Sequence, residues 1–113
     1  MGGYGREVRT REPFRRNLEA LAALAHDRGE RVLLTTYASY IPPDYSEEKF
    51  AARELDYVLY TAPIALWGEV ENIRSGLAAH NAVVREIVAS DPSLEFTDIE
   101  AAIPDEGRYY DDV

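Results

Sequence analysis

The sequence predicts an α/β protein whose helices cover a parallel sheet, as in a doubly wound α/β/α sandwich. Two segments, residues 13–30 and 69–90, repeat apolar residues every three or four positions, which indicates amphipathic helices. A short apolar run suited to a buried strand follows each of them, at residues 31–37 and 94–99. Helix and strand therefore alternate along the chain, and this alternation is typical of a parallel sheet.

The first predicted helix, within residues 13–30, spans about four turns. Pro13 suits a first helical turn, where a backbone N–H would have no hydrogen-bond partner within the helix. Gly29 suits the position just past the helix end, where the backbone often becomes left-handed. The apolar positions of this helix are Phe14, Leu18, Leu21 and Leu24.

The first predicted strand is RVLLTTY, residues 31–37, an apolar and β-branched run directly after a helix that ends in glycine. Beyond it, residues 38–66 lose any clear period, and Pro42-Pro43 breaks the chain near their start. We expect a long irregular excursion there. Within it, residues 57–66 (YVLYTAPIAL) suit a third strand, a turn of helix or a surface loop equally.

The second predicted helix runs from about Glu69 to Ser90 and ends at Asp91-Pro92, because proline cannot continue a helix. Gly76 is a point at which this helix could divide or kink. Its apolar face consists of Val70, Ile73, Leu77, Val84, Ile87 and Val88. Residues 94–99 (LEFTDI) form the next predicted strand, and a loop containing proline and glycine follows.

Composition limits the classes of function. The 113 residues have the size of one domain, and 46% hydrophobic with 29% charged residues suits a globular core. The net charge of −9 repels a phosphate backbone, so we expect no nucleic-acid partner. No run approaches the roughly 18 apolar residues of a membrane span, and MGGYGREVRTRE lacks the apolar core of a signal peptide. We expect a soluble chain whose compartment the sequence leaves open.

The sequence suggests neither a cofactor nor a metal. Cysteine is absent, which excludes disulfides, thiolate catalysis and zinc–thiolate sites. The acidic pairs Glu47-Glu48 and Asp111-Asp112 do not have the spacing of a calcium-binding EF-hand loop.

Five segments in order, FRRNLEALAALAHDRGERVLLTTY, LWG, LAAHNAVVREI, LEFTDI and YYDDV, cover nearly the whole chain. Together they resemble the later half of the SGNH (GDSL-like) serine hydrolases. The resemblance matches Asn17-Leu18 before the strand VLLTT, His80-Asn81 before the pattern F-x-D, and Asp111-Asp112 after a loop. It implies a flavodoxin-like sandwich, with residues 1–113 as one partial domain holding the last two or three strands and their helices.

The resemblance also implies a catalytic acid. In that family an Asp-x-x-His block, often written D-D-V-H or D-D-V-C-H, supplies two members of the triad. The acid would be Asp111 or Asp112, depending on whether histidine came one or two positions after Val113. The aspartate of such a triad holds the imidazole in the correct tautomer and stabilises its charged form. A solvated acidic terminus is the plain alternative for both residues.

The departures from this family concern the remaining catalytic groups. The chain contains no Gly-Asp-Ser block, no Gly-x-Asn-Asp block and no histidine after Asp112. None of its serines lies in a nucleophile motif. We therefore expect residues 1–113 to lack hydrolase activity alone, since a serine nucleophile requires a neighbouring base.

Other candidate residues have structural interpretations. For His80 and Asn81 we expect partly buried, hydrogen-bonded side chains rather than a catalytic base. His26 suits a helix end, where a cation meets the negative end of the dipole. Asp98 follows a strand, where α/β sheets place ligands, but a loop-capping role is the simpler prediction. Among the eight tyrosines, those between Tyr37 and Tyr60 are expected to pack on the core rather than form a substrate rim.

Two functions remain. The first is part of a serine esterase or lipase that hydrolyses a small ester or acylated substrate through an acyl-serine intermediate. The second is a small non-enzymatic α/β protein that completes its sheet as a homodimer or with a partner chain, because two parallel strands cannot bury both faces of a sheet.

Overall fold

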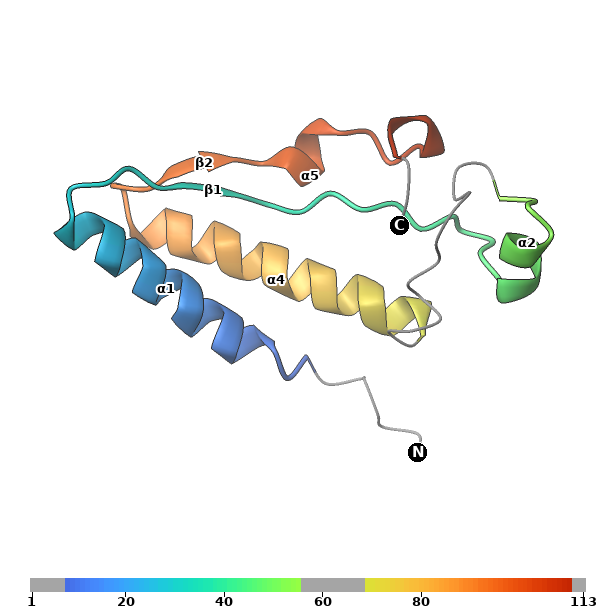
Figure 1. The fold of residues 1–113 in the computed structure, drawn as a ribbon, viewed down its shortest axis with the longest axis horizontal. Helices are drawn as coiled ribbons and strands as arrows, with labels where there is room; N and C mark the ends of the chain where they lie inside the picture. Colours follow the sequence, from blue (N-terminus) through green and yellow to red (C-terminus); the bar gives the residue numbers. More distant parts are fainter. Residues whose placement is uncertain (1–7, 56–68, 111–113) are drawn as a thin grey trace.

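The computed structural model describes residues 8–55 and 69–110. They form a small α/β structure in which two long helices flank a two-stranded parallel sheet (Figure 1). Helix α1 (Arg11–Asp27) leads into strand β1 (Leu33–Thr35), and helix α4 (Val70–Ser90) leads into strand β2 (Glu95–Thr97). The shorter elements are α2 (Glu47–Ala51), α5 (Ile99–Ala102) and the 3₁₀ turn η1 (Gly107–Tyr109). The predicted α/β character is confirmed, and the third strand predicted as one option within 57–66 lies outside the described residues.

Both strands are shorter than the apolar runs that predicted them. Strand β1 covers Leu33–Thr35 of the predicted 31–37, and β2 covers Glu95–Thr97 of the predicted 94–99. Each strand has only the other as its partner among the described residues, so the ladder extends no further than their overlap. At the end of β2, Asp98 becomes the N-cap of α5, and Ile99 is therefore helical.

The register of the strands divides their side chains between two faces. Leu33 pairs with Glu95, Leu34 with Phe96 and Thr35 with Thr97. Successive side chains of a strand point to opposite faces. Leu34 and Phe96 are half-buried, whereas the residues on either side of each are exposed. One face of the sheet is thus covered, and the other is open among the described residues.

Helix α1 ends just before Gly29, as the sequence predicted. Gly29 adopts a φ of 69°, which glycine tolerates without steric cost. The Gly29 N–H donates to the His26 carbonyl at 3.1 Å, and the Glu30 N–H donates to the Ala25 carbonyl at 2.8 Å. These two bonds form a Schellman motif, which satisfies carbonyls at the helix end and turns the chain toward β1.

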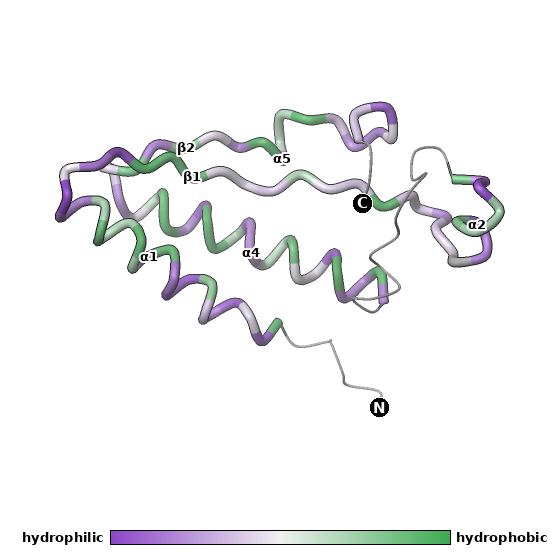
Figure 2. Tube along the Cα trace, in the orientation of Figure 1, coloured by the Kyte–Doolittle hydropathy of each residue, from purple (hydrophilic) through white to green (hydrophobic). Residues whose placement is uncertain are grey.

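Helices α1 and α4 pack against each other on one side of the strands (Figure 1). The hydropathy of both alternates along the chain, as expected for amphipathic helices (Figure 2). The Phe14 ring stacks on His80 with centroids 4.3 Å apart, and Arg15 forms a salt bridge with Glu86. Helix α4 runs through Gly76 without interruption. Its buried residues, which make up most of the helical core, are Ala79, Asn81, Val83, Val84 and Ile87.

A second cluster lies in the segment that follows β1. Tyr40 and Leu55 are buried, and Tyr45, Phe50 and Tyr110 pack against them. This agrees with the prediction that the tyrosines of this region pack their rings, although Tyr37 is 59% exposed. The segment also contains α2, which the sequence patterns did not predict. Ser46 caps this helix by accepting from the Lys49 N–H at 3.1 Å.

The end of α2 gives a first stability prediction. Arg53 has a φ of 59°, a left-handed conformation that is costly for a residue with a Cβ atom. Replacing Arg53 by glycine should stabilise the protein by about 0.5 to 1 kcal/mol, after allowing for the greater entropy of glycine in the unfolded chain. Urea denaturation followed by circular dichroism measures this change. Arg53→Ala is the matched control, and an equal gain in both variants would show that the backbone conformation is not the cause.

Candidate functional site at the carboxyl ends of the strands

The carboxyl ends of β1 and β2 carry the most connected polar cluster among the described residues. We call it the carboxyl-edge network; its members are Thr36, Asn81, Arg85, Asp98 and Glu100. Thr36 directly follows β1, Asp98 directly follows β2, and Glu100 lies in α5. Asn81 and Arg85 are four residues apart on α4, so they lie on one helical face one turn apart.

Asn81 joins α4 to the chain that leaves β1. Only 2% of its surface is exposed. Its side-chain oxygen accepts from the Tyr37 N–H at 2.8 Å, and its amide nitrogen donates to the Tyr37 carbonyl at 2.9 Å. The same nitrogen donates to Glu100 at 2.6 Å. The amide thus pairs with the Tyr37 backbone as a neighbouring strand would, which satisfies both peptide groups where the ladder has ended.

Arg85 forms salt bridges with both carboxylates of the network. Its guanidinium donates to both oxygens of Asp98, at 3.0 and 3.2 Å, and to Glu100 at 2.7 Å. These bonds raise the pKa of Arg85 further above its ordinary value. Hydrogen bonds from Arg85 and then from Thr36 lower the pKa of Asp98 to about 2. Both groups are therefore held in their charged forms, and Asp98 cannot serve as a proton acceptor near neutral pH.

Asp98 has the capping role that the sequence predicted. Its Oδ1 atom accepts from the Thr36 hydroxyl at 2.7 Å and from the Ala101 N–H at 3.3 Å, as the N-cap of α5. Thr36, which is 2% exposed, also accepts from the Glu100 N–H at 2.9 Å. The two residues join the carboxyl ends of both strands to the start of α5.

The low pKa of Asp98 predicts a pH dependence. The pKa is lower in the folded protein than the ordinary value of 3.8, so the stabilisation is complete above about pH 4 and is lost as the pH falls toward about 2. We expect Asp98→Asn to be less stable at pH 7, and the difference from the unmodified protein to shrink between pH 4 and pH 2. Urea denaturation at several pH values measures it. A constant difference would exclude titration of Asp98 as the cause.

The residues implied as catalytic acid, Asp111 and Asp112, lie outside the described residues. The described residue that precedes them in the sequence is Tyr110. Its ring stacks on Tyr40 with centroids 5.7 Å apart. Burial, followed by the charges of Asp105 and Glu100, raises the pKa of Tyr110. Tyr40 lies in the chain that continues beyond the carboxyl end of β1, so Tyr110 packs on that continuation.

The two histidines are not bonded to the network. His80 hydrogen-bonds through Nε2 to the Thr10 hydroxyl at 2.7 Å and stacks on Phe14, so it holds α4 against the start of α1. His80 is half-buried and hydrogen-bonded, as predicted, but its partner is the Thr10 side chain and not the neighbouring backbone that the prediction named. His26 lies in the last turn of α1, as predicted.

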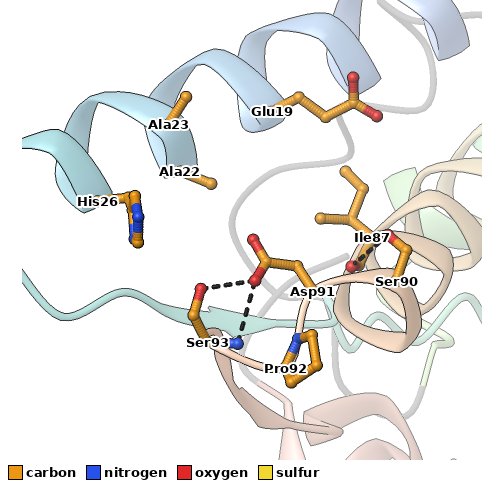
Figure 3. A pocket seen from close by; sticks show the side chains of 9 residues that line it. All are labelled: Glu19, Ala22, Ala23, His26, Ile87, Ser90, Asp91, Pro92 and Ser93. Carbon is orange, nitrogen blue, oxygen red and sulfur yellow. Dashed lines mark hydrogen bonds between the residues drawn. The ribbon is translucent and has the colours of Figure 1, made fainter.

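A cavity of about 480 Å³ lies at the opposite edge, between α1 and the turn from α4 to β2 (Figure 3). His26, Asp91 and Ser93 line it together with Glu19 and apolar residues. The Ser93 hydroxyl donates to Asp91, and this bond lowers the pKa of Asp91. Because Ser93 donates to a carboxylate and not to an imidazole, these three side chains lack the order of a serine–histidine–aspartate relay.

Within residues 8–55 and 69–110, no three acidic or histidine side chains lie close enough together to hold a metal ion. None of the helices in these two ranges has the length and apolar content of a membrane span. No protein-family model matches the chain, and no curated protein or solved structure matches it either.

Sequence reasoning did not single out three members of the network, Thr36, Arg85 and Glu100. The available signals were the spacing of four between Asn81 and Arg85, and two carboxylates at Asp98 and Glu100 directly after an apolar run. These signals are common on exposed surfaces. They indicate a polar cluster only when the parallel pairing of β1 and β2 is known, because that pairing brings the ends of both strands to one edge.

Proposed function

We propose that residues 1–113 are the later part of an SGNH-type serine hydrolase, an esterase or lipase in its complete form. The reaction class, ester hydrolysis by a serine nucleophile, rests on the resemblance of the sequence to that family. The parallel order of β1 and β2, with α1 and α4 packed together, supports membership of a larger doubly wound sheet.

The position of Tyr110 is the observation that most favours this proposal. Tyr110 packs on Tyr40, in the chain that continues beyond the carboxyl end of β1, and it immediately precedes Asp111 and Asp112 in the sequence. Open α/β sheets bind their ligands outside the carboxyl ends of their strands. An acid on this segment would have the location that a triad requires.

In this proposal the carboxyl-edge network has a structural function. Its carboxylates are paired with Arg85, and its amide is bonded to the Tyr37 backbone, so none of its groups is available as a nucleophile or base. The network stiffens the edge beside which the catalytic acid would lie. The serine, the histidine and the oxyanion donors would come from outside residues 1–113.

The proposal predicts that the 113-residue chain does not hydrolyse p-nitrophenyl acetate above the rate in buffer. A serine hydroxyl without a neighbouring base is a weak nucleophile. A fluorophosphonate probe should likewise label no serine, as judged by intact-mass spectrometry. Turnover that Asp111→Asn or Asp112→Asn abolished would show that a complete site exists in this chain and would contradict the proposal.

Sequencing the genomic DNA on both sides of the coding region tests the assignment directly. A Gly-Asp-Ser block upstream and a histidine codon one or two positions after Val113 would support it. The position of the histidine would also decide between Asp111 and Asp112. A stop codon after Val113, with no Gly-Asp-Ser block in any adjoining reading frame, would overturn it.

The exposed apolar residues favour a second candidate, a non-enzymatic protein that completes its sheet as a homodimer. Leu33 on the open face of β1 is 57% exposed. Sedimentation equilibrium distinguishes the candidates, because a dimer that unfolds cooperatively supports this second function and a monomer opposes it.

A further inference from the structure

We infer that the cavity between α1 and the turn from α4 to β2 is a binding site for an aliphatic diammonium ion, a short hydrocarbon chain with a primary amine at each end. None of the residues that line this cavity belongs to the carboxyl-edge network. Its ligand therefore does not depend on hydrolase activity.

The cavity has the size and the apolar surface of a small-molecule site. Its volume of about 480 Å³ lies within the range of roughly 300 to 1,000 Å³ that is usual for such sites. Ala22 and Ile87, which are 9% and 4% exposed, form part of its lining together with Pro92. A hydrocarbon chain can cover these side chains without leaving a polar group unpaired.

The charged groups of the lining favour a cation. Two carboxylates, Glu19 and Asp91, line the cavity, and none of the described lysine or arginine side chains does. Glu19 comes from α1 and Asp91 from the turn after α4, and Ile87 lies between them in the view of Figure 3. Two negative groups with an apolar side chain between them match a ligand that is positive at both ends and hydrocarbon in the middle.

Asp91 is held in place and keeps one oxygen for a ligand. Its Oδ1 atom accepts from the Ser93 N–H at 3.0 Å and from the Ser93 hydroxyl at 2.5 Å. The bonds from Ser93 lower the pKa of Asp91, so the carboxylate is ionised near neutral pH. No described residue donates to its Oδ2 atom, which is left as an acceptor at the cavity.

Glu19 also keeps its acceptors. Arg15, one turn earlier on α1, forms its salt bridge with Glu86 of α4 and not with Glu19. The Glu19 side chain is exposed and has no hydrogen bond to another described residue. It can therefore reach an ammonium group without giving up an existing partner.

Other classes of ligand fit this lining less well. A metal ion needs more ligands, because no three acidic or histidine side chains of the described residues lie close enough together to hold one. An anion would be repelled by both carboxylates, and a neutral apolar molecule would cover them without pairing them. His26, which also lines the cavity, suits an amine, since a neutral imidazole can accept from an ammonium N–H.

The test is an NMR titration of the nitrogen-15-labelled 113-residue chain with 1,4-diaminobutane at pH 8, where imidazole groups are ordinarily neutral. The amide signals of Ala22, Ala23 and Ser93 should shift along saturating curves, with a dissociation constant of about 1 to 10 mM, because exposed ion pairs are individually weak. n-Butylamine, with a single ammonium group, should bind about fivefold or more weakly. 1-Butanol, with no charge, should give no saturating shift.

Three variants assign the binding to the two carboxylates. Glu19→Gln and Asp91→Asn should each weaken diamine binding about fivefold or more, with circular dichroism as the check on folding. Glu12→Gln is the matched control, because it removes the same charge from an exposed position of α1 that does not line the cavity. Its affinity should change by less than about twofold, since salt screens distant charges.

Three outcomes would overturn the inference. Shifts that rise linearly with the diamine concentration would show that no site exists. Equal binding of n-butylamine or 1-butanol would show that the second charge, or any charge, is not recognised. Equal weakening by Glu12→Gln would show that only the net charge of the chain attracts the diamine. None of these readouts involves ester hydrolysis, so the diamine site and the proposed function can fail independently.

Discussion

Asn81→Ala should destabilise the protein by about 2 to 4 kcal/mol, the largest effect that we expect from a polar substitution. Asn81 is 2% exposed and makes hydrogen bonds to the Tyr37 N–H, the Tyr37 carbonyl and Glu100. Alanine would leave both Tyr37 peptide groups without their partner beside a buried helix face. The higher helix propensity of alanine offsets only about 0.5 kcal/mol of this loss. Urea denaturation followed by circular dichroism measures the change.

Two further variants make the Asn81 experiment specific. Asn72→Ala, on the same helix, is the matched control, because no hydrogen bond joins the Asn72 side chain to another described residue. Asn81→Asp keeps an acceptor for the Tyr37 N–H but directs negative charge at the Tyr37 carbonyl and at Glu100. We expect it to be at least as damaging as alanine at pH 7. Equal effects of the substitutions at positions 72 and 81 would refute the role assigned to Asn81.

The helix ends could be predicted because local sequence determines them. Gly29 predicted the end of α1 through its left-handed conformation, and Asp91-Pro92 predicted the end of α4 through the proline that follows. The bounds of α4 differ from the prediction by a single residue. In each case the physical cause lies within a few residues of the boundary.

The strands and the carboxyl-edge network could be predicted only in part, because they depend on distant segments. An apolar run predicts a strand, but the partner decides its length, and β1 has only β2 beside it among the described residues. The bonds of Thr36 to Asp98 join residues 62 positions apart, and those of Asn81 to Tyr37 span 44. Such pairs follow from the topology and not from any local pattern.

Ile87→Ala should destabilise the protein by about 2 to 3 kcal/mol, the low end of the range for large-to-small core substitutions. Ile87 is 4% exposed on α4 and also borders the cavity beside α1, so part of the lost volume would open toward that cavity. The surrounding side chains, including Ala22 and Ala23, are small and cannot move inward to fill the space (Figure 3). The urea midpoint again measures the change.

Leu24→Ala is the matched control for Ile87→Ala, since both substitutions remove an aliphatic side chain from a long helix. Leu24 is 54% exposed, and we expect a loss of no more than about 0.5 kcal/mol in the 113-residue chain. Equal losses for Leu24→Ala and Ile87→Ala would show that the burial of Ile87 is not the cause of its cost.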